Sequence, residues 1–131
     1  MAGTPPLLGF LQLRQLASAA ARVACPACAA LVCPGWETLS ATYDRANLRR
    51  VGTLRDPAID EPTLQEFHPS GTNAWAVDAP IAPAFFPYNR CDVWQCVRCS
   101  RPLLRYTEYG GYYEEERIRD LDARLLVDAS P

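Results

Sequence analysis

Six cysteines carry most of the chemistry that this sequence could perform, and four of them form two pairs of one kind. Cys25 and Cys28 are separated by two residues, as are Cys96 and Cys99. A short turn between two cysteines directs both sulfurs to one side. Two such turns brought together offer four thiolates, the ligand set of a closed tetrahedral zinc site. The spacing therefore predicts one structural zinc ion per chain, held by these four cysteines.

The second pair also has a suggestive context. Trp94 precedes Cys96, and β-prone residues follow from Arg101 to Tyr109, which gives the order strand, cysteine turn, strand. This resembles the zinc-ribbon and rubredoxin-like class of cysteine turns, called knuckles, and the resemblance implies a metal ion rather than an activity. Zinc ribbons commonly separate their pairs by ~15–20 residues. Here residues 29–95 intervene, which costs little because loop-closure entropy grows only logarithmically with length.

The remaining cysteines, Cys33 and Cys91, extend the two pairs in mirror image, each separated from its pair by four intervening residues. Three roles are open for them. They could be buried residues that act as small apolar side chains, additional or alternative metal ligands, or members of an iron–sulfur site. The second cluster has plant-type ferredoxin spacing, but valine, tryptophan and glutamine replace the glycine and serine usual in that loop. Thiol–disulfide exchange at Cys25 and Cys28 is disfavoured, because a helix is expected before this pair rather than after it.

His68 is the only histidine and lies in the stretch EFHPSGT. It could replace one cysteine as a metal ligand, act as a general base, or hold a turn. The sequence places no serine, aspartate or second histidine at a recognisable catalytic spacing from it. A turn role is therefore favoured, with metal binding as the alternative.

Arginine and aromatic residues gather around the second cysteine pair. Arginine binds phosphate while aromatic rings stack on bases, so such a cluster is a candidate contact surface for nucleic acid or a partner protein. Acidic residues follow from Glu108 to Asp122 and could instead pair with these arginines across a hairpin. The candidate contacts are Arg90, Trp94, Arg98, Arg101 and Arg105.

Several elements must position these residues. Thr4 can cap a helix with proline in its first turn, and apolar residues recur at helical spacing from Leu7 to Val23. Asp44 could cap a short helix that ends near Arg50. A proline-rich, aromatic stretch covers residues 56–90 and has no clear periodicity. Long loops of this kind are often functional, and this one is expected to recognise a partner.

The last third is predicted to be β-structure. Asp92–Gln95 reads as a strand that enters the second cysteine pair. The runs Leu103–Tyr109 and Tyr112–Arg119 flank Gly110-Gly111, a hairpin signal. Leu125–Val127 could add a further strand, while a helix over residues 114–126 competes with this interpretation.

Together these features predict a single α+β domain over residues 1–131. It comprises an N-terminal helix and a small antiparallel β-sheet with zinc-ribbon-like knuckles and a long inserted loop. The first knuckle spans residues 23–35, the inserted region 36–90, and the second knuckle with its hairpin 91–128.

Composition and charge exclude some classes of function. The net charge is −2, so no global field draws the chain to nucleic acid or anionic membrane. The apolar stretches fall short of the ~20 residues that cross a bilayer. All basic residues are arginine, beside abundant alanine and proline, a composition like that of GC-rich bacteria. The N-terminus lacks a basic signal region. We expect a cytoplasmic, non-enzymatic module that binds another protein; nucleic-acid binding is the alternative, and a metal or thiol enzyme the third possibility.

Overall fold

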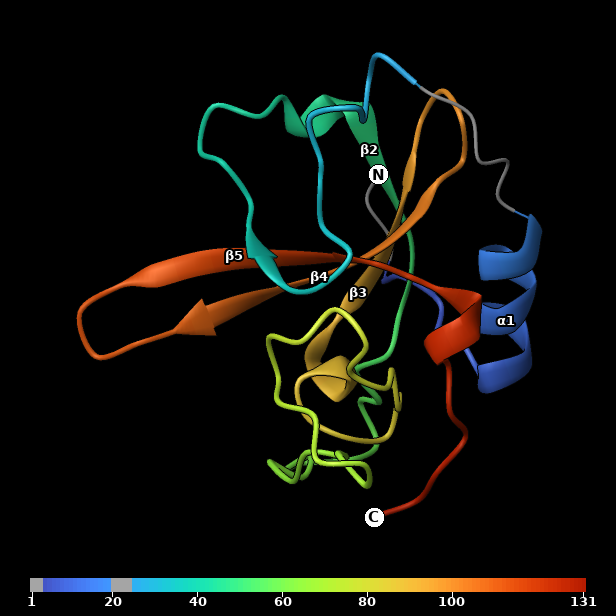
Figure 1. Ribbon diagram of the computed structural model, residues 1–131, viewed down its shortest axis with the longest axis vertical. Coiled ribbons are helices and arrows are strands. Elements are labelled where there is room, and N and C mark those ends of the chain that lie inside the picture. Colours follow the sequence, from blue (N-terminus) through green and yellow to red (C-terminus); the bar gives the residue numbers. More distant parts are fainter. Residues whose placement is uncertain (1–3, 20–24) are drawn as a thin grey trace.

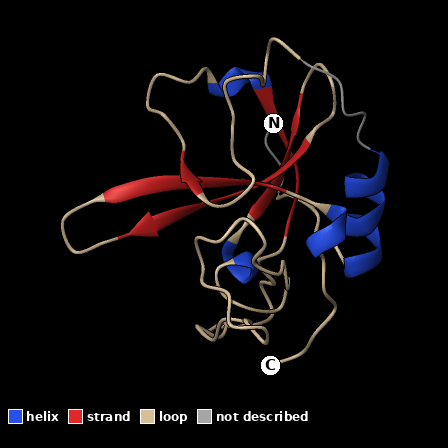
Figure 2. Cartoon of the chain, viewed as in Figure 1, coloured by secondary structure: helices blue, strands red, loops and turns tan. Residues whose placement is uncertain are grey.

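A five-stranded antiparallel sheet forms the centre of the computed structural model, which describes residues 4–19 and 25–131 (Figures 1 and 2). The strand order is β1-β5-β4-β3-β2. In this part of the chain one α-helix, α1, packs beside the sheet. The predicted α+β class and antiparallel pairing are confirmed. The strands are β1 Glu37–Thr38, β2 Leu48–Thr53, β3 Asp92–Cys96, β4 Pro102–Tyr109 and β5 Glu114–Asp120.

Helix α1 spans Phe10–Ala19, so the prediction of a helix from the first prolines was wrong at its start. The backbone N–H of Leu8 donates to the carbonyl of Thr53 (3.0 Å), and the N–H of Thr53 donates to the carbonyl of Pro6 (2.9 Å). This pairing holds the segment extended beside β2. The helix then buries Leu13 against the sheet. The predicted helical residues 20–23 lie outside the described residues.

The predicted helix between Asp44 and Arg50 was also wrong. Asp44 does act as a cap, accepting a hydrogen bond from the N–H of Ala46, but only for the 3₁₀ helix η1 (Arg45–Asn47). The chain then enters β2, because pairing with β3 satisfies its backbone groups. A bulge between Arg50 and Gly52 brings the glycine against Leu8, where a Cβ atom would lie 2.5 Å from a leucine methyl.

The predicted hairpin is confirmed as β4 and β5, although its turn has four residues rather than two. The N–H of Gly110 donates to the carbonyl of Tyr113 (2.8 Å), and Tyr109 stands opposite Glu114. The competing helix over residues 114–126 was therefore wrong. The predicted strand at Leu125–Val127 is replaced by the end of the 3₁₀ helix η3 (Ala123–Leu125) and a single bridge to residue 81. The hairpin projects well beyond the rest of the sheet (Figure 1).

The long segment before β3 is irregular, as predicted, but it is anchored to the sheet. Its one short helix is the 3₁₀ helix η2 (Tyr88–Arg90). Arg119 of β5 is fully buried and donates to the hydroxyl of Tyr88 (2.6 Å) and the carbonyl of Ala79 (2.9 Å). Ile81 and Phe85 are buried. These contacts fix the loop against the face of the sheet.

Candidate metal centre

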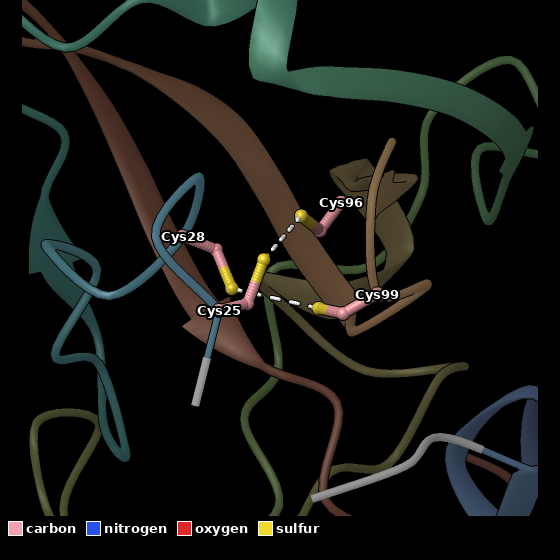
Figure 3. Close-up of side chains that lie close together, drawn as sticks. All are labelled: Cys25, Cys28, Cys96 and Cys99. Atoms are coloured by element: carbon pink, nitrogen blue, oxygen red, sulfur yellow. Dashed lines mark hydrogen bonds between the residues drawn. The ribbon is translucent and has the colours of Figure 1, made fainter. Parts of the chain in front are cut away.

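Two distant segments bring four cysteine sulfurs together (Figure 3). The Sγ atoms of Cys25 and Cys96 are 3.7 Å apart, and those of Cys28 and Cys99 are 3.6 Å apart. All four lie within 4.8 Å of one another. A tetrahedral ion with metal–sulfur bonds of ~2.3 Å separates its ligands by ~3.8 Å. The cluster can therefore hold a metal ion with little rearrangement.

The second pair sits in a tight turn between β3 and β4. The N–H of Cys96 donates to the carbonyl of Arg101 (3.0 Å), and the N–H of Ser100 donates to the carbonyl of Cys96 (2.9 Å). Ser100 has a φ of 63°, which lets the chain reverse directly after the second cysteine. The turn thus places both sulfurs on the side that faces the first pair.

Backbone N–H donors lower the pKa of one of these thiols, that of Cys96. Burial raises the pKa of Cys96, but the N–H groups of Cys99 and Arg98 oppose this and lower the pKa to about 7. Burial raises the pKa of Cys28 to about 12, although Arg101 acts in the opposite direction. The cluster thus contains one readily formed thiolate, Cys96, and a bound cation would displace the proton of Cys28.

The first pair lies in a turn outside the sheet, so other groups must hold it. The N–H of Cys28 donates to the carbonyl of Cys25 (3.2 Å). The carbonyl of Ala27 accepts from the hydroxyl of Tyr43 (2.7 Å) and the side-chain amide of Asn47 (3.2 Å). The carbonyl of Asn47 also accepts from the N–H of Val97 (2.9 Å). Asn47 therefore joins the two cysteine turns.

Arg101 is the second link between the turns. Its guanidinium donates to the carbonyls of Cys28 (2.9 Å) and Leu31 (2.6 Å). The same group pairs with Asp120 at 2.7 Å. Cys33 Sγ lies 3.7 Å away. The side chain of Arg101 is 23% exposed, so these charge-assisted bonds form in a partly desolvated setting.

The other candidate ligands lie outside the four-cysteine cluster. Cys33 and Cys91 are buried, and burial raises the pKa of Cys33 to about 12 and that of Cys91 well above its usual range. Cys91 donates to the carbonyl of Pro87 in the core between the sheet and the long loop. The ring of His68 lies between Thr72 (2.8 Å) and Glu66 (3.0 Å) in the loop.

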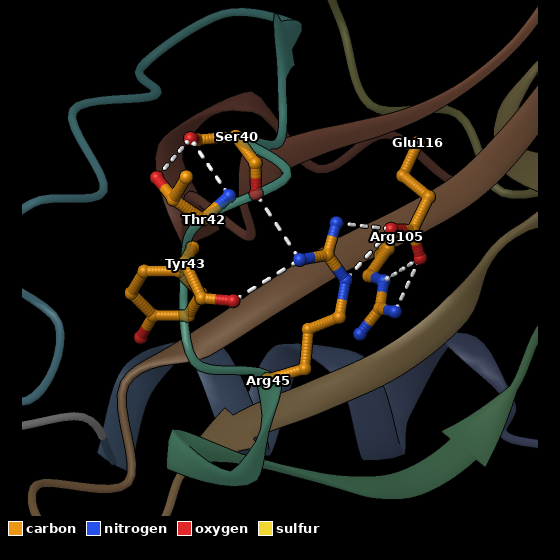
Figure 4. A network of polar contacts seen from close by, with 6 residues as sticks. All are labelled: Ser40, Thr42, Tyr43, Arg45, Arg105 and Glu116. Atoms are coloured by element: carbon orange, nitrogen blue, oxygen red, sulfur yellow. Dashed lines mark hydrogen bonds and ion pairs between the residues drawn. The ribbon is translucent and has the colours of Figure 1, made fainter.

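Most of the predicted arginine contacts are engaged within the protein. Arg101 pairs with Asp120 as described, and Arg105 pairs with Glu116 while its guanidinium lies 4.4 Å from the ring centroid of Trp94. Glu116 also accepts a hydrogen bond from Arg45. The guanidinium of Arg45 in turn donates to the carbonyls of Ser40 and Tyr43 (Figure 4). Acidic residues of the hairpin therefore pair with arginines. This is the arrangement that the sequence offered as the alternative to a nucleic-acid contact surface.

Two more arginines complete this set. Arg90 donates to the carbonyl of Pro62 (2.8 Å), and its guanidinium lies 5.8 Å from the ring centroid of Phe86. Arg98 is exposed.

Sequence reasoning missed Tyr43 and Asn47, because no spacing or composition connects them with cysteines tens of residues away.

The chain matches no family model, no curated protein and no solved structure.

Among the described residues, no helix is both long and apolar enough to pass through a bilayer.

Proposed function

We propose that this protein binds one structural zinc ion through Cys25, Cys28, Cys96 and Cys99. The observation that carries the proposal is the approach of four sulfurs within 4.8 Å of one another from two turns far apart in the sequence. Thiolates are soft ligands that suit zinc and iron. Zinc accepts a tetrahedral four-sulfur site without redox chemistry, which suits a structural role.

The metal acts as a clamp in this proposal. Residues 25–33 contain no regular strand, and they contact the sheet through a few bonds, such as that from the N–H of Asp120 to the carbonyl of Cys33 (2.8 Å). A metal bound between this segment and the turn after β3 ties it to the sheet. Binding energy at such a site becomes folding energy, because the site does not exist in the unfolded chain.

We further propose a non-enzymatic role, in which the domain is an accessory module that binds another protein. Four cysteine ligands fill all positions of a tetrahedral ion and leave none for a substrate. Exposed tyrosines at the hairpin turn support partner binding, since tyrosine is enriched at interfaces. Tyr109 and Tyr113 have exposed fractions of 74% and 49%, and Tyr112 is fully exposed. The cysteine-rich, metal-dependent design suits the reducing cytoplasm.

A chelator titration tests the clamp. The purified protein is incubated with a zinc chelator under reducing conditions while amide hydrogen exchange is followed. Exchange should accelerate first in residues 25–33 and 96–101, and added zinc should restore protection. Iron in the site would be recognised by the visible absorption of its thiolate complex, which zinc lacks. If exchange in both cysteine turns is the same with and without chelator, the structural role is wrong.

A further inference from the structure

The outer half of β4 has an unpaired edge. Strand β3 begins at Asp92, which stands opposite Arg105, whereas β4 continues to Tyr109. Before Asp92 the chain turns away, because the N–H of Cys91 bonds back to Tyr88 within η2. In the described part of the chain, the last four residues of β4 therefore pair with β5 on one edge and with no strand on the other.

The hydrogen-bond alternation of the sheet shows which backbone groups face this edge. The N–H of Gly110 bonds to Tyr113 across the hairpin, so the even-numbered residues of β4 face β5. The N–H of Cys96 bonds to the carbonyl of Arg101, so the odd-numbered residues face β3. The N–H and C=O groups of Thr107 and Tyr109 therefore point outward, where β3 has ended. Such an edge is a template for another strand.

A groove of about 770 Å³ runs along this edge. Its walls come from the edge of β4 and from the long loop, which contributes Leu64, Phe86 and Arg90. Leu64 is 71% exposed, and the rings of Phe86 and Trp94 add apolar surface. The groove therefore offers apolar contacts beside the free backbone groups.

Three arginines and three acidic residues line the groove, but only the arginines include groups without a charged partner among the residues that the structure describes. Its acidic residues are already paired: Asp92 with Arg50, Glu108 with Arg117, and Glu116 with Arg45 and Arg105. In contrast, Arg55 and Arg90 donate only to backbone carbonyls in the contacts described for them. These two guanidinium groups line the groove without a carboxylate partner within 4.0 Å among the described residues.

Three buried donors in the groove walls also lack an acceptor. They are Arg90 Nε, Trp94 Nε1 and Arg105 NH1. Because these three atoms are closed off from solvent, the groups that a ligand in the groove can reach are instead the guanidinium groups of Arg55 and Arg90. A carboxylate provides up to four acceptor positions and binds arginine strongly.

We propose that this groove binds an extended acidic segment of a partner protein. The segment adds a strand beside Thr107 and Tyr109 and places a carboxylate side chain against Arg55 and Arg90. Its apolar side chains contact the rings of the groove. This inference rests on the proposed role as a protein-binding module and supplies the chemical class of its partner.

Capped hexapeptides that alternate glutamate with valine, leucine or tyrosine are suitable probes, with lysine versions as charge controls. They are titrated into metal-loaded, isotope-labelled protein and followed by NMR. We expect the amide resonances of Thr107 and Tyr109 to shift with a Kd of about 10⁻⁴ M. The lysine peptides should not bind. Arg90→Gln should weaken binding about tenfold or more, because it removes a charge-assisted contact.

Two further variants make the test specific. Thr107→Pro removes one outward N–H without breaking a ladder bond and should abolish the shift of the Tyr109 amide, which remains as the reporter. Arg124→Gln removes the same charge as Arg90→Gln from a side chain that is 77% exposed on η3, and binding should be unchanged. Metal content and melting temperature are measured on every sample, so loss of folding is distinguished from loss of binding.

Several outcomes would overturn the inference. These are no shift at Thr107 and Tyr109 at millimolar acidic peptide, equal binding of the lysine peptides, or equal binding by Arg90→Gln. Concentration-dependent dimerisation through β4 would show instead that a second copy of the chain occupies the edge. A partner that binds Arg90→Gln and Thr107→Pro as well as the unchanged protein would refute the groove while leaving the binding role intact.

Discussion

Replacing Arg101 by glutamine should loosen both cysteine turns. The guanidinium donates to two carbonyls of the first turn and pairs with Asp120. Hydrogen bonds from charged groups contribute about 1.5–3 kcal/mol each, and a partly exposed ion pair adds up to ~1 kcal/mol. Glutamine can retain one of these contacts. We therefore expect Arg101→Gln to lower the free energy of unfolding by about 2–4 kcal/mol.

The metal should respond to the same change. Groups that orient metal ligands typically contribute about 10–100-fold to metal affinity. Urea unfolding followed by circular dichroism measures the stability, and competition with a chromophoric chelator measures the affinity. Arg98→Gln is the matched control, because Arg98 lies in the same turn with an exposed side chain. Equal behaviour of Arg101→Gln and Arg98→Gln in both assays would refute the linking role of Arg101.

Three further substitutions address the site and its surroundings. Cys96→Ser should abolish stoichiometric metal binding and unfold or strongly destabilise the domain, and a variant with unchanged melting temperature would contradict this. His68→Ala should leave metal content unchanged and alter stability by less than about 0.5 kcal/mol, whereas loss of metal on elemental analysis would make His68 a ligand. Burial raises the pKa of Glu116, but its two arginine partners outweigh burial and lower it. Glu116→Gln should therefore lower the free energy of unfolding by about 1 kcal/mol near neutral pH. In urea-unfolding series, the difference in stability between this variant and the unchanged protein should shrink as the pH falls below ~4, because the paired carboxylate then becomes protonated. A stability difference that stays constant with pH would be the contrary result.

The strands around the second cysteine pair could be predicted because their signals are local. Alternating β-prone residues on both sides of Gly110-Gly111 determine the hairpin, and β3 leads directly into Cys96. The pairing of the cysteines was also predictable, since repeated spacing is independent of the distance between the pairs. The zinc-ribbon character of the two knuckles stays a prediction.

The elements that were mispredicted depend on contacts between distant residues. The segment before α1 has helical periodicity, but pairing of Pro6 and Leu8 with Thr53 holds it extended. The segment from Leu48 contains residues compatible with a helix, yet β3 offers its backbone a ladder of bonds. No local pattern predicts such partners.

The arginines were recognised as a group, but their roles could not be separated from the sequence. Arg101 holds the first cysteine turn, and Arg105 is neutralised by Glu116. Arg90 donates to the carbonyl of Pro62 and lies over the ring of Phe86. These differences arise from which strand or loop stands opposite each residue. Spacing along the chain does not contain that information.

The metal content of the purified native protein, measured together with its free thiols, tests the four-thiolate metal site. We expect one zinc per chain. In the native, metal-loaded protein no thiol should react freely, because four are metal ligands and Cys33 and Cys91 are buried, whereas chelator with denaturant should expose all six. A protein that contains no metal, contains disulfides, or binds metal equally well after Cys25 and Cys96 are both changed to serine would contradict it.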